Sequence, residues 1–430
     1  MQIHLKTLGC RLNEAELENW AQGFQQAGHS ICRDIHQADL IILNSCAVTQ
    51  EAVRKSRQQI RRIHRDNPEA KLVVSGCYVS LNEEEAAQLL GVDLIISNKD
   101  KNQLVDIVLN QLNITAMPQL ATEPGETALF NRGRQRAFVK VQDGCRYRCT
   151  FCIVTVARGK EKSRPLNEII EEINRLHAQG IQEVILTGVH LGGFGSDINS
   201  DLSALIKTIL AETDIPRLRL GSLEPWELPE TFFDLFSNAR LMPHLHLPLQ
   251  SGADSVLRRM ARRCKTAEFQ QMVTQARHNN PLFNITTDII VGFPGETEQE
   301  WQQSLEFIEQ SGFGHIHIFT YSTRQGTKAA TMPEPVPNAI KKQRSQHLHQ
   351  SAEKMKQDFM QQNFGKTWPV LWEGQREMLD NGQQRVFGYT SNYLRVACDI
   401  KPNRHIENQI ISATLVSTEK DYCLTELQSS

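Results

Sequence analysis

The sequence predicts an α/β protein in three parts: a doubly wound parallel sheet, a partial (β/α)6 barrel and a small C-terminal β-barrel. Three observations support this prediction. Short apolar runs alternate with amphipathic helical patterns through residues 1–112, and the same alternation repeats about six times through residues 131–330. Five short alternating runs without helices then follow residue 367.

The first part is predicted to span residues 1–112, with helical patterns at 14–27 and 51–65. Its expected strands cover residues 3–8, 39–44, 71–75 and 93–97. Strands that alternate with helices favour a parallel sheet covered on both faces. Pro118, Pro124 and Gly125 lie among polar residues, which predicts a linker at 113–130.

The second part is predicted to span residues 131–363. Its expected strands cover residues 138–142, 183–187, 217–222, 244–248, 285–291 and 315–321. Helical patterns include 167–179 and 299–311, and a polar helix at about 339–363 closes this part. Six consecutive βα units indicate a partial barrel with its site at the carboxyl ends of the strands.

The third part is predicted to span residues 364–430. Its expected strands cover residues 368–372, 385–389, 393–398, 409–416 and 422–427. Five short strands favour a small barrel of the oligonucleotide-binding kind.

Composition narrows the class of protein. The 430-residue chain has a formal net charge of −2, so nucleic-acid contacts must come from local basic patches. No apolar run reaches the roughly 18 residues needed to span a bilayer, and residues 1–10 lack the pattern of a secretion signal. We therefore expect a soluble, cytoplasmic protein without a membrane partner. Structural disulfides are disfavoured there, so the ten cysteines favour metal or redox roles.

The strongest local pattern is Cys145-x-x-x-Cys149-x-x-Cys152, directly after the first predicted barrel strand. Three thiolates on one loop can bind three irons of a [4Fe–4S] cluster and leave the fourth iron open. The alternatives are a zinc loop or chance clustering. Zinc normally takes a fourth protein ligand, and this loop contains no His.

A second set of cysteines is separated in sequence. Cys10, Cys46 and Cys77 each follow a predicted strand of the first sheet. Because the carboxyl ends of parallel strands share an edge, we expect the three to converge and to hold a second cluster. The alternative is three buried packing cysteines. Cys32, Cys264, Cys398 and Cys423 are interpreted as packing residues.

With both sets in view, the chain resembles the methylthiotransferase family of radical S-adenosylmethionine (SAM) enzymes over essentially its whole length. The matching segments are Thr7-Leu-Gly-Cys-Arg-Leu-Asn13, Asn44-Ser-Cys-Ala-Val-Thr49, Ser75-Gly-Cys77, Asp143-Gly-Cys145, Ala157-Arg-Gly159, Pro248-Leu-Gln-Ser-Gly252 and Val291-Gly-Phe-Pro-Gly-Glu-Thr297. The resemblance implies a flavodoxin-like N-terminal domain, a radical SAM barrel and a C-terminal TRAM domain.

The resemblance also implies the chemistry: two [4Fe–4S] clusters and SAM as cofactors, with no catalytic residue beyond the clusters. Cys145, Cys149 and Cys152 would support radical formation, and Cys10, Cys46 and Cys77 would hold the auxiliary cluster. The implied partners are a tRNA anticodon stem-loop, with no DNA, and an electron donor such as flavodoxin or ferredoxin.

Three substrate branches compete within the family: threonylcarbamoyladenosine in tRNA, isopentenyladenosine in tRNA, and an aspartate of a ribosomal protein. The segments Arg54-Lys-Ser-Arg57 and Ser222-Leu-Glu-Pro-Trp-Glu227 are similar to the first branch, which acts on the adenosine 3′ of the anticodon. A non-catalytic iron–sulfur protein that binds RNA is the alternative from another class.

Further site residues are predicted at strand ends and on basic patches. The SAM candidates are Phe151, Thr187, Gly188, Gln250 and Gly292, although the two glycines could be simple turn residues. RNA contacts are predicted along a helical stripe and on the C-terminal barrel, where bases and aromatics interleave. The residues are Arg54, Arg57, Arg61, Arg65, Arg385, Tyr389, Tyr393 and Arg395, with a solvated face or core packing as the alternative.

Overall fold

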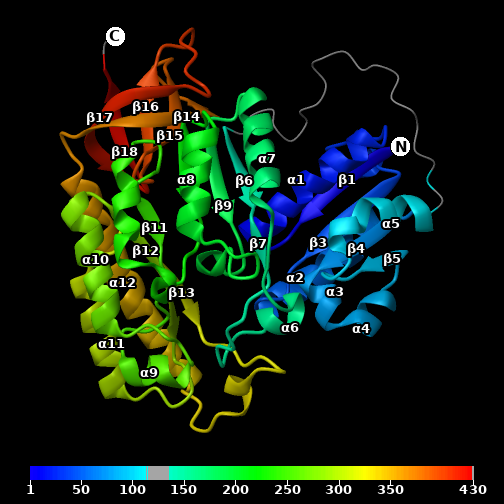
Figure 1. Ribbon diagram of the computed structural model, residues 1–430, viewed down its shortest axis with the longest axis horizontal. Coiled ribbons are helices and arrows are strands. Elements are labelled where there is room, and N and C mark those ends of the chain that lie inside the picture. The colour runs from blue at the N-terminus through cyan, green and yellow to red at the C-terminus, as the bar shows by residue number, and fades with distance from the viewer. Residues whose placement is uncertain (113, 115–134, 429–430) are drawn as a thin grey trace.

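The computed structural model describes residues 1–112, 114 and 135–428, and its three parts are seen in Figure 1. We call them the N-terminal layer (residues 1–112), the central barrel (residues 135–363) and the C-terminal barrel (residues 364–428). The predicted linker at 113–130 lies outside the described residues, apart from residue 114. Across the described ranges, the protein has no helix whose length and hydropathy would let it span a membrane.

The N-terminal layer is built on a five-stranded parallel sheet in the order β2-β1-β3-β4-β5. The strands are β1 (Gln2–Thr7), β2 (Ser30–Ile31), β3 (Leu40–Ser45), β4 (Lys71–Gly76) and β5 (Leu94–Ile96). β3 is buried throughout, as expected of a central strand covered on both faces. This order is flavodoxin-like, and such sheets bind ligands where the strand order reverses, between β1 and β3. The predicted doubly wound sheet is confirmed, with β2 as an added edge strand.

Helices cover both faces of this sheet. α1 (Arg11–Gln26) and α5 (Leu104–Gln111) pack on one face, where Phe24 and Leu104 are fully buried. α2 (Gln50–Asp66), α3 (Cys77–Leu81) and α4 (Glu83–Ala87) pack on the other, where Ile60 and Tyr78 are fully buried. The two layers of apolar contacts hold the carboxyl ends of β1, β3 and β4 at one edge.

The central barrel contains six parallel strands in sequence order. They are β6 (Arg136–Lys140), β9 (Glu183–Thr187), β10 (Arg217–Leu220), β11 (His244–His246), β12 (Asn284–Val291) and β13 (His315–Thr320). Two three-stranded sheets, β10-β9-β6 and β11-β12-β13, are joined by parallel bridges such as Leu218 to Leu241. The partial (β/α)6 barrel predicted from the sequence is therefore confirmed. A short antiparallel pair, β7 (Gln142–Asp143) and β8 (Lys162–Ser163), brackets the cysteine loop.

Helices follow the barrel strands, and most pack on their outer face: α7 (Leu166–Ala178), α8 (Leu202–Glu212), α10 (Thr266–Asn279), α11 (Glu298–Ser311) and α12 (Asn338–Gln362). The short α6 (Val154–Arg158) packs instead against the N-terminal layer, and α9 (Asp254–Arg259) packs beside Phe293 and Tyr321. After β10 the connection is instead a 3-10 helix (Glu230–Ser237). Apolar residues of the strands face this shell: Ile285 and Ile316, for example, belong to the main core.

The C-terminal barrel is closed and has five strands in the order β14-β15-β16-β18-β17. Its strands are β14 (Thr367–Met378), β15 (Gln384–Thr390), β16 (Arg395–Ile400), β17 (Ile410–Glu419) and β18 (Tyr422–Leu427). It packs against the amino-terminal ends of the central strands (Figure 1). Arg217 at the start of β10 donates to the carbonyl of Tyr389 at 3.0 Å, and Asn284 at the start of β12 donates to that of Asn392 at 2.8 Å.

Buried charges join the N-terminal layer to the central barrel. Arg158 of α6 pairs with Glu16 of α1 and with Asp143 of β7, both at 3.0 Å, and donates to Asn13 at 2.8 Å. Lys101 pairs with the same Glu16, and all three of Arg158, Glu16 and Lys101 have side chains no more than 3% exposed. Because every charge is paired, the network holds the two cysteine-bearing parts in one relative position.

Replacing Glu16 by Gln is expected to lower the free energy of unfolding by about 3–5 kcal/mol, since three cations, Arg158, Lys101 and Lys140, would then share Asp143. Burial alone would raise the pKa of Glu16, but Arg158 and Lys101 lower it from 4.5 to about 2. The stabilisation is therefore fully present above pH 4.5 and is lost as the pH falls toward 2. Urea unfolding of both proteins over this pH range measures it.

The matched control is Glu14→Gln on the same helix, where the carboxylate pairs with the exposed Arg11 at 3.3 Å. Its effect should stay within about 0.5 kcal/mol. A Glu16→Gln effect no larger than this, or one that does not change with pH, would contradict the assigned role of the network.

Candidate active site

All six cysteines singled out from the sequence line one cavity of about 790 Å³. Its mouth lies at the carboxyl ends of the central strands, where Cys145, Cys149 and Cys152 face Cys10, Cys46 and Cys77 of the N-terminal layer. From there it runs through the interior of the central barrel to the C-terminal barrel. The structure thus brings both predicted cysteine triads to one cavity.

The loop triad, Cys145, Cys149 and Cys152, lies between β7 and α6 with all three thiols free. The loop is closed by a bond from the amide of Cys145 to the carbonyl of Gly159 at 3.1 Å. The amide of Val154 donates to the sulfur of Cys152 at 3.4 Å. Backbone N–H groups aimed at sulfur are a feature of iron–sulfur sites, where they tune the reduction potential.

The sheet triad occupies the strand ends predicted for it. Cys10 caps the start of α1 after β1, Cys46 follows β3, and Cys77 opens α3 after β4. Gly9 has φ +114°, and a Cβ there would lie 2.8 Å from the Cys46 sulfur, so only glycine lets β1 and β3 approach this closely. The side chain of Asn98 donates to the sulfur of Cys77 at 3.6 Å.

The chemistry of these thiols fits a metal cluster. Burial raises the pKa of Cys145 to about 12 and that of Cys152 to about 11, and it also raises the pKa of Cys46. Thiolates at these positions therefore need nearby positive charge, which iron ions would supply. Among the remaining cysteines, Cys264, Cys398 and Cys423 are buried and Cys32 is half-buried, as expected of packing residues.

Four of the five predicted SAM-binding residues line the cavity: Phe151, Thr187, Gly188 and Gln250. Gln250 has φ +80°, a strained backbone of the kind that concentrates at functional sites. Gly292 is not among the lining residues. Its amide donates to Glu296 at 2.9 Å, and a Cβ at this position would lie 2.4 Å from the Cγ of Lys341.

The segment 222–227 brings a half-buried carboxylate beside the cysteine loop. Glu224 lies 3.6 Å from the Nε2 of His190, and burial raises its pKa. Trp226 stacks under the guanidinium of Arg262, whose Nη1 lies 4.0 Å from the Cys149 sulfur. Glu224, Trp226 and Arg262 all line the cavity, so a segment noted for its family pattern contributes to the site itself.

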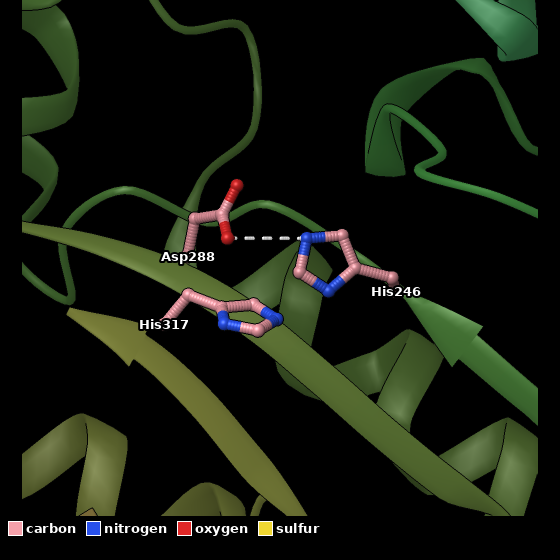
Figure 2. A group of neighbouring side chains, drawn as sticks. All are labelled: His246, Asp288 and His317. Carbon is pink, nitrogen blue, oxygen red and sulfur yellow. Dashed lines mark ion pairs between the residues drawn. The ribbon is translucent and has the colours of Figure 1, made fainter. Parts of the chain in front are cut away.

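The interior of the central barrel is polar, which was not predicted. Every second residue of β11, β12 and β13 points inward, and seven of these side chains line the cavity: His244, His246, Asn284, Thr286, Asp288, His315 and His317. Figure 2 shows His246, Asp288 and His317 converging from the three strands. The signal was present in the sequence as alternation of polar residues with buried apolar ones.

The predicted basic stripe lies along a groove of about 1450 Å³ on α2. Arg54, Arg61 and Arg65 are exposed there, whereas Arg57 pairs with Glu85 at 2.6 Å. The groove also includes Ile153 and Val156 of the cysteine-loop region and Arg324. The groove therefore extends from the arginines of α2 to the cysteine-loop region, where the mouth of the cavity lies.

The four candidates on the C-terminal barrel have different surroundings. Arg385 pairs with Asp399 and Glu419, each at 2.7 Å. Tyr389 and Tyr393 stack on each other, and the guanidinium of Arg136 lies 4.4 Å from the Tyr389 ring. Tyr389, Tyr393 and Arg395 line the inner end of the cavity.

Comparison with known proteins identifies the family. The model of the uncharacterized protein family UPF0004 matches residues 2–97, and that of the radical SAM superfamily matches residues 139–308. The threonylcarbamoyladenosine tRNA methylthiotransferase MtaB of Thermotoga maritima is 37% identical over 378 residues, which are 86% of each chain. The chain belongs to the radical SAM methylthiotransferase family. It is an enzyme that uses SAM and an iron–sulfur cluster.

Other members of the family are similar over nearly the whole chain. MtaB of Bacillus subtilis is 32% identical over 92% of this chain and 89% of its own length. The tRNA-2-methylthio-N(6)-dimethylallyladenosine synthase of a Wolbachia species is 29% identical over 99% of both chains. Among solved structures, the radical SAM methyltransferase TsrM from Kitasatospora setae shares the fold, with a TM-score of 0.57, 16% identity and coverage of 76% of this chain and 77% of its own.

Proposed function

We propose that this methylthiotransferase attaches a methylthio group to carbon 2 of threonylcarbamoyladenosine, the adenosine 3′ of the anticodon in tRNA. The observation that carries the proposal is the single cavity lined by both cysteine triads and by the polar interior of the barrel. Carbon 2 of adenine has no acidic proton, so acid–base catalysis is a poor tool there. A radical source and a sulfur donor must both reach the same carbon, which requires one shared space.

The proposed ligands are Cys145, Cys149 and Cys152 for one [4Fe–4S] cluster and Cys10, Cys46 and Cys77 for a second. Bound together with SAM, these groups supply the radical and the sulfur that the reaction needs. The protein holds the triads facing each other through the Arg158–Glu16 network, and Asn98 and the amide of Val154 donate to their sulfurs.

Phe151, Thr187, Gly188 and Gln250 are the proposed SAM contacts, because they line the cavity beside the loop triad. Gly292 has the weakest support, since it is not among the lining residues. We also propose that residues 1–112, 131–363 and 364–430 act as the three functional domains, joined at 113–130, and that flavodoxin or ferredoxin supplies electrons.

The choice of threonylcarbamoyladenosine over isopentenyladenosine rests on two observations. Relatives named for the first substrate are 32–37% identical, against 29–33% for three relatives named for the second. The cavity also presents ionisable side chains, Arg219, His246 and Asp288 among them. A threonylcarbamoyl group carries a carboxylate, a hydroxyl and a urea that such a lining can bind. The Nη1 of Arg219, for example, is buried and has no hydrogen-bond partner among the described residues, and an isopentenyl group could not accept from it.

The groove on α2 is proposed to hold the phosphates of the anticodon stem-loop, because exposed arginines line it and its inner end adjoins the cysteine-loop region. Tyr389, Tyr393 and Arg395 line the inner end of the cavity and are proposed to contact the RNA from there. Arg385 is the least available of the predicted RNA contacts, since both of its ion pairs are within the C-terminal barrel.

Replacing Arg54 and Arg61 together by Gln should weaken tRNA binding for all sequences and reduce the slope of log affinity against log salt by about 1 per lost phosphate contact. Filter binding at several salt concentrations measures both quantities. Arg175→Gln, which removes an exposed arginine from α7, is the control and should change neither. An unchanged salt slope in the double variant would remove α2 from the proposed RNA interface.

The function itself is tested with two tRNA substrates, one that carries threonylcarbamoyladenosine and one that carries isopentenyladenosine. Reconstituted, reduced protein with SAM should convert the first to its 2-methylthio derivative, detected by mass spectrometry of nucleosides. Conversion of only the isopentenyl substrate would assign the protein to the isopentenyladenosine branch of the family. Conversion of neither, by protein that cleaves SAM, would refute a tRNA substrate.

A further inference from the structure

Three side chains inside the central barrel form a group separate from the cysteine triads. His246, Asp288 and His317 come from the adjacent strands β11, β12 and β13 (Figure 2). Asp288 and His317 are direct partners in the parallel register, and the Nε2 of His246 lies 3.2 Å from the Oδ1 of Asp288. One ligand atom from each residue lies within 4.8 Å of the other two.

The ring of His246 is held in place from its other side. Its Nδ1 lies 2.9 Å from the hydroxyl of Thr286, which in turn lies 3.3 Å from the Nε2 of His244. When Thr286 donates its one proton to His244, it accepts from the Nδ1–H of His246. The Nε2 lone pair of His246 then faces Asp288. Such a second hydrogen bond, which fixes the tautomer and the ring plane, is the usual support of a metal-binding histidine.

Asp288 and His317 have unused binding capacity. Within the described residues, the Asp288 carboxylate has no side-chain partner other than the ring of His246, and the ring of His317 makes no hydrogen bond. The ring nitrogens of His317 and the carboxylate of Asp288 can therefore bind the same cation.

The group also faces open space. All three residues line the 790 Å³ cavity, and the side chains of His246 and Asp288 remain 14% and 23% exposed. Two histidines and one carboxylate on one side of an ion leave the remaining coordination positions open to the cavity. This ligand set is typical of divalent first-row transition metals, such as Fe²⁺ or Zn²⁺.

We propose that His246, Asp288 and His317 bind one divalent transition-metal ion, separate from the iron–sulfur clusters. The ion lies in the middle of the barrel cavity. Its open positions accept oxygen ligands from the molecule that enters there. The site depends on the barrel strands and not on the identity of the tRNA substrate.

The test uses full-length holoenzyme with filled clusters, dialysed anaerobically against Zn²⁺, with zinc and iron counted separately. Wild-type protein should retain one zinc per chain. Asp288→Asn and His317→Gln should each weaken zinc binding by about 100-fold or more, since loss of a ligand exceeds the cost of losing an outer partner. The iron content of each variant should match the wild type, which also reports that the variant is folded.

His315→Gln is the matched control, because His315 lies on the same face of β13 but outside the group. It should bind zinc as the wild type does. X-ray absorption should show zinc with nitrogen and oxygen ligands near about 2.0–2.1 Å and no sulfur near about 2.3 Å. Absence of zinc in the wild type, sulfur ligands, retention in both ligand variants, or loss in His315→Gln would each overturn the proposal.

Discussion

Replacing Cys149 by Ala is expected to abolish the reductive cleavage of SAM completely. Cys149 is the middle member of the loop triad, and its sulfur faces the same cavity as the proposed SAM contacts Thr187 and Gly188. With two of three ligands left, the loop cannot hold its cluster, so no electron reaches SAM. The measurement is 5′-deoxyadenosine by chromatography after chemical reduction.

Cys32→Ala is the control for this variant, because Cys32 is a half-buried cysteine of the N-terminal layer outside both triads. It should cleave SAM at the wild-type rate. Cleavage that persists in a folded Cys149→Ala protein would mean that the loop does not form the radical site.

Replacing Cys46 by Ala should have an equally large effect, but on the methylthio product and not on the cleavage of SAM. Cys46 follows β3 in the N-terminal layer, at the same edge of the sheet as Cys10 and Cys77, whereas the loop triad lies in the central barrel. The loop triad is left intact, so 5′-deoxyadenosine should still form. No methylthio product should appear on tRNA, because the proposed sulfur donor is missing.

Two outcomes would contradict this division of labour. Loss of both readouts, in a folded Cys46→Ala protein whose loop cluster is present, would argue that the triads do not act separately. Methylthio product at the wild-type level would show that the sulfur comes from elsewhere. The same Cys32→Ala protein serves as control and should give both products.

The cysteine geometry could be predicted from the sequence because it depends on topology alone. Cys10, Cys46 and Cys77 each follow a recognisable strand, and parallel strands end at a common edge. The shared cavity also follows from two such edges facing each other. By contrast, the edge strand β2 spans only Ser30–Ile31, too short to produce a period-2 pattern.

The partners of charged residues could not be predicted, because they depend on register and on packing between parts. Arg385 was interpreted as an RNA contact, yet β15 and β16 pair so that it lies directly opposite Asp399. Arg158 belongs to a family segment and to a run of basic residues near the cysteine loop, yet it bridges α6 and α1 through Glu16. Neither relation has a signal in the local sequence.

The polar interior of the central barrel could be predicted from the sequence only in part. Polar residues two positions apart, such as His244 and His246 or Thr286 and Asp288, are visible in the sequence. This spacing was interpreted only as a pattern of strands, since period 2 gives the faces but not which face is inward. The structure assigns the polar face to the cavity.

The most direct test of the two-cluster site is the iron and sulfide content of anaerobically reconstituted protein. The wild type should hold about eight irons per chain on its two triads, and the Cys10, Cys46 and Cys77 triple Ala variant about four. The Cys145, Cys149 and Cys152 triple variant should also hold about four. A wild-type value near four that does not change in the first variant would contradict a second cluster in this cavity.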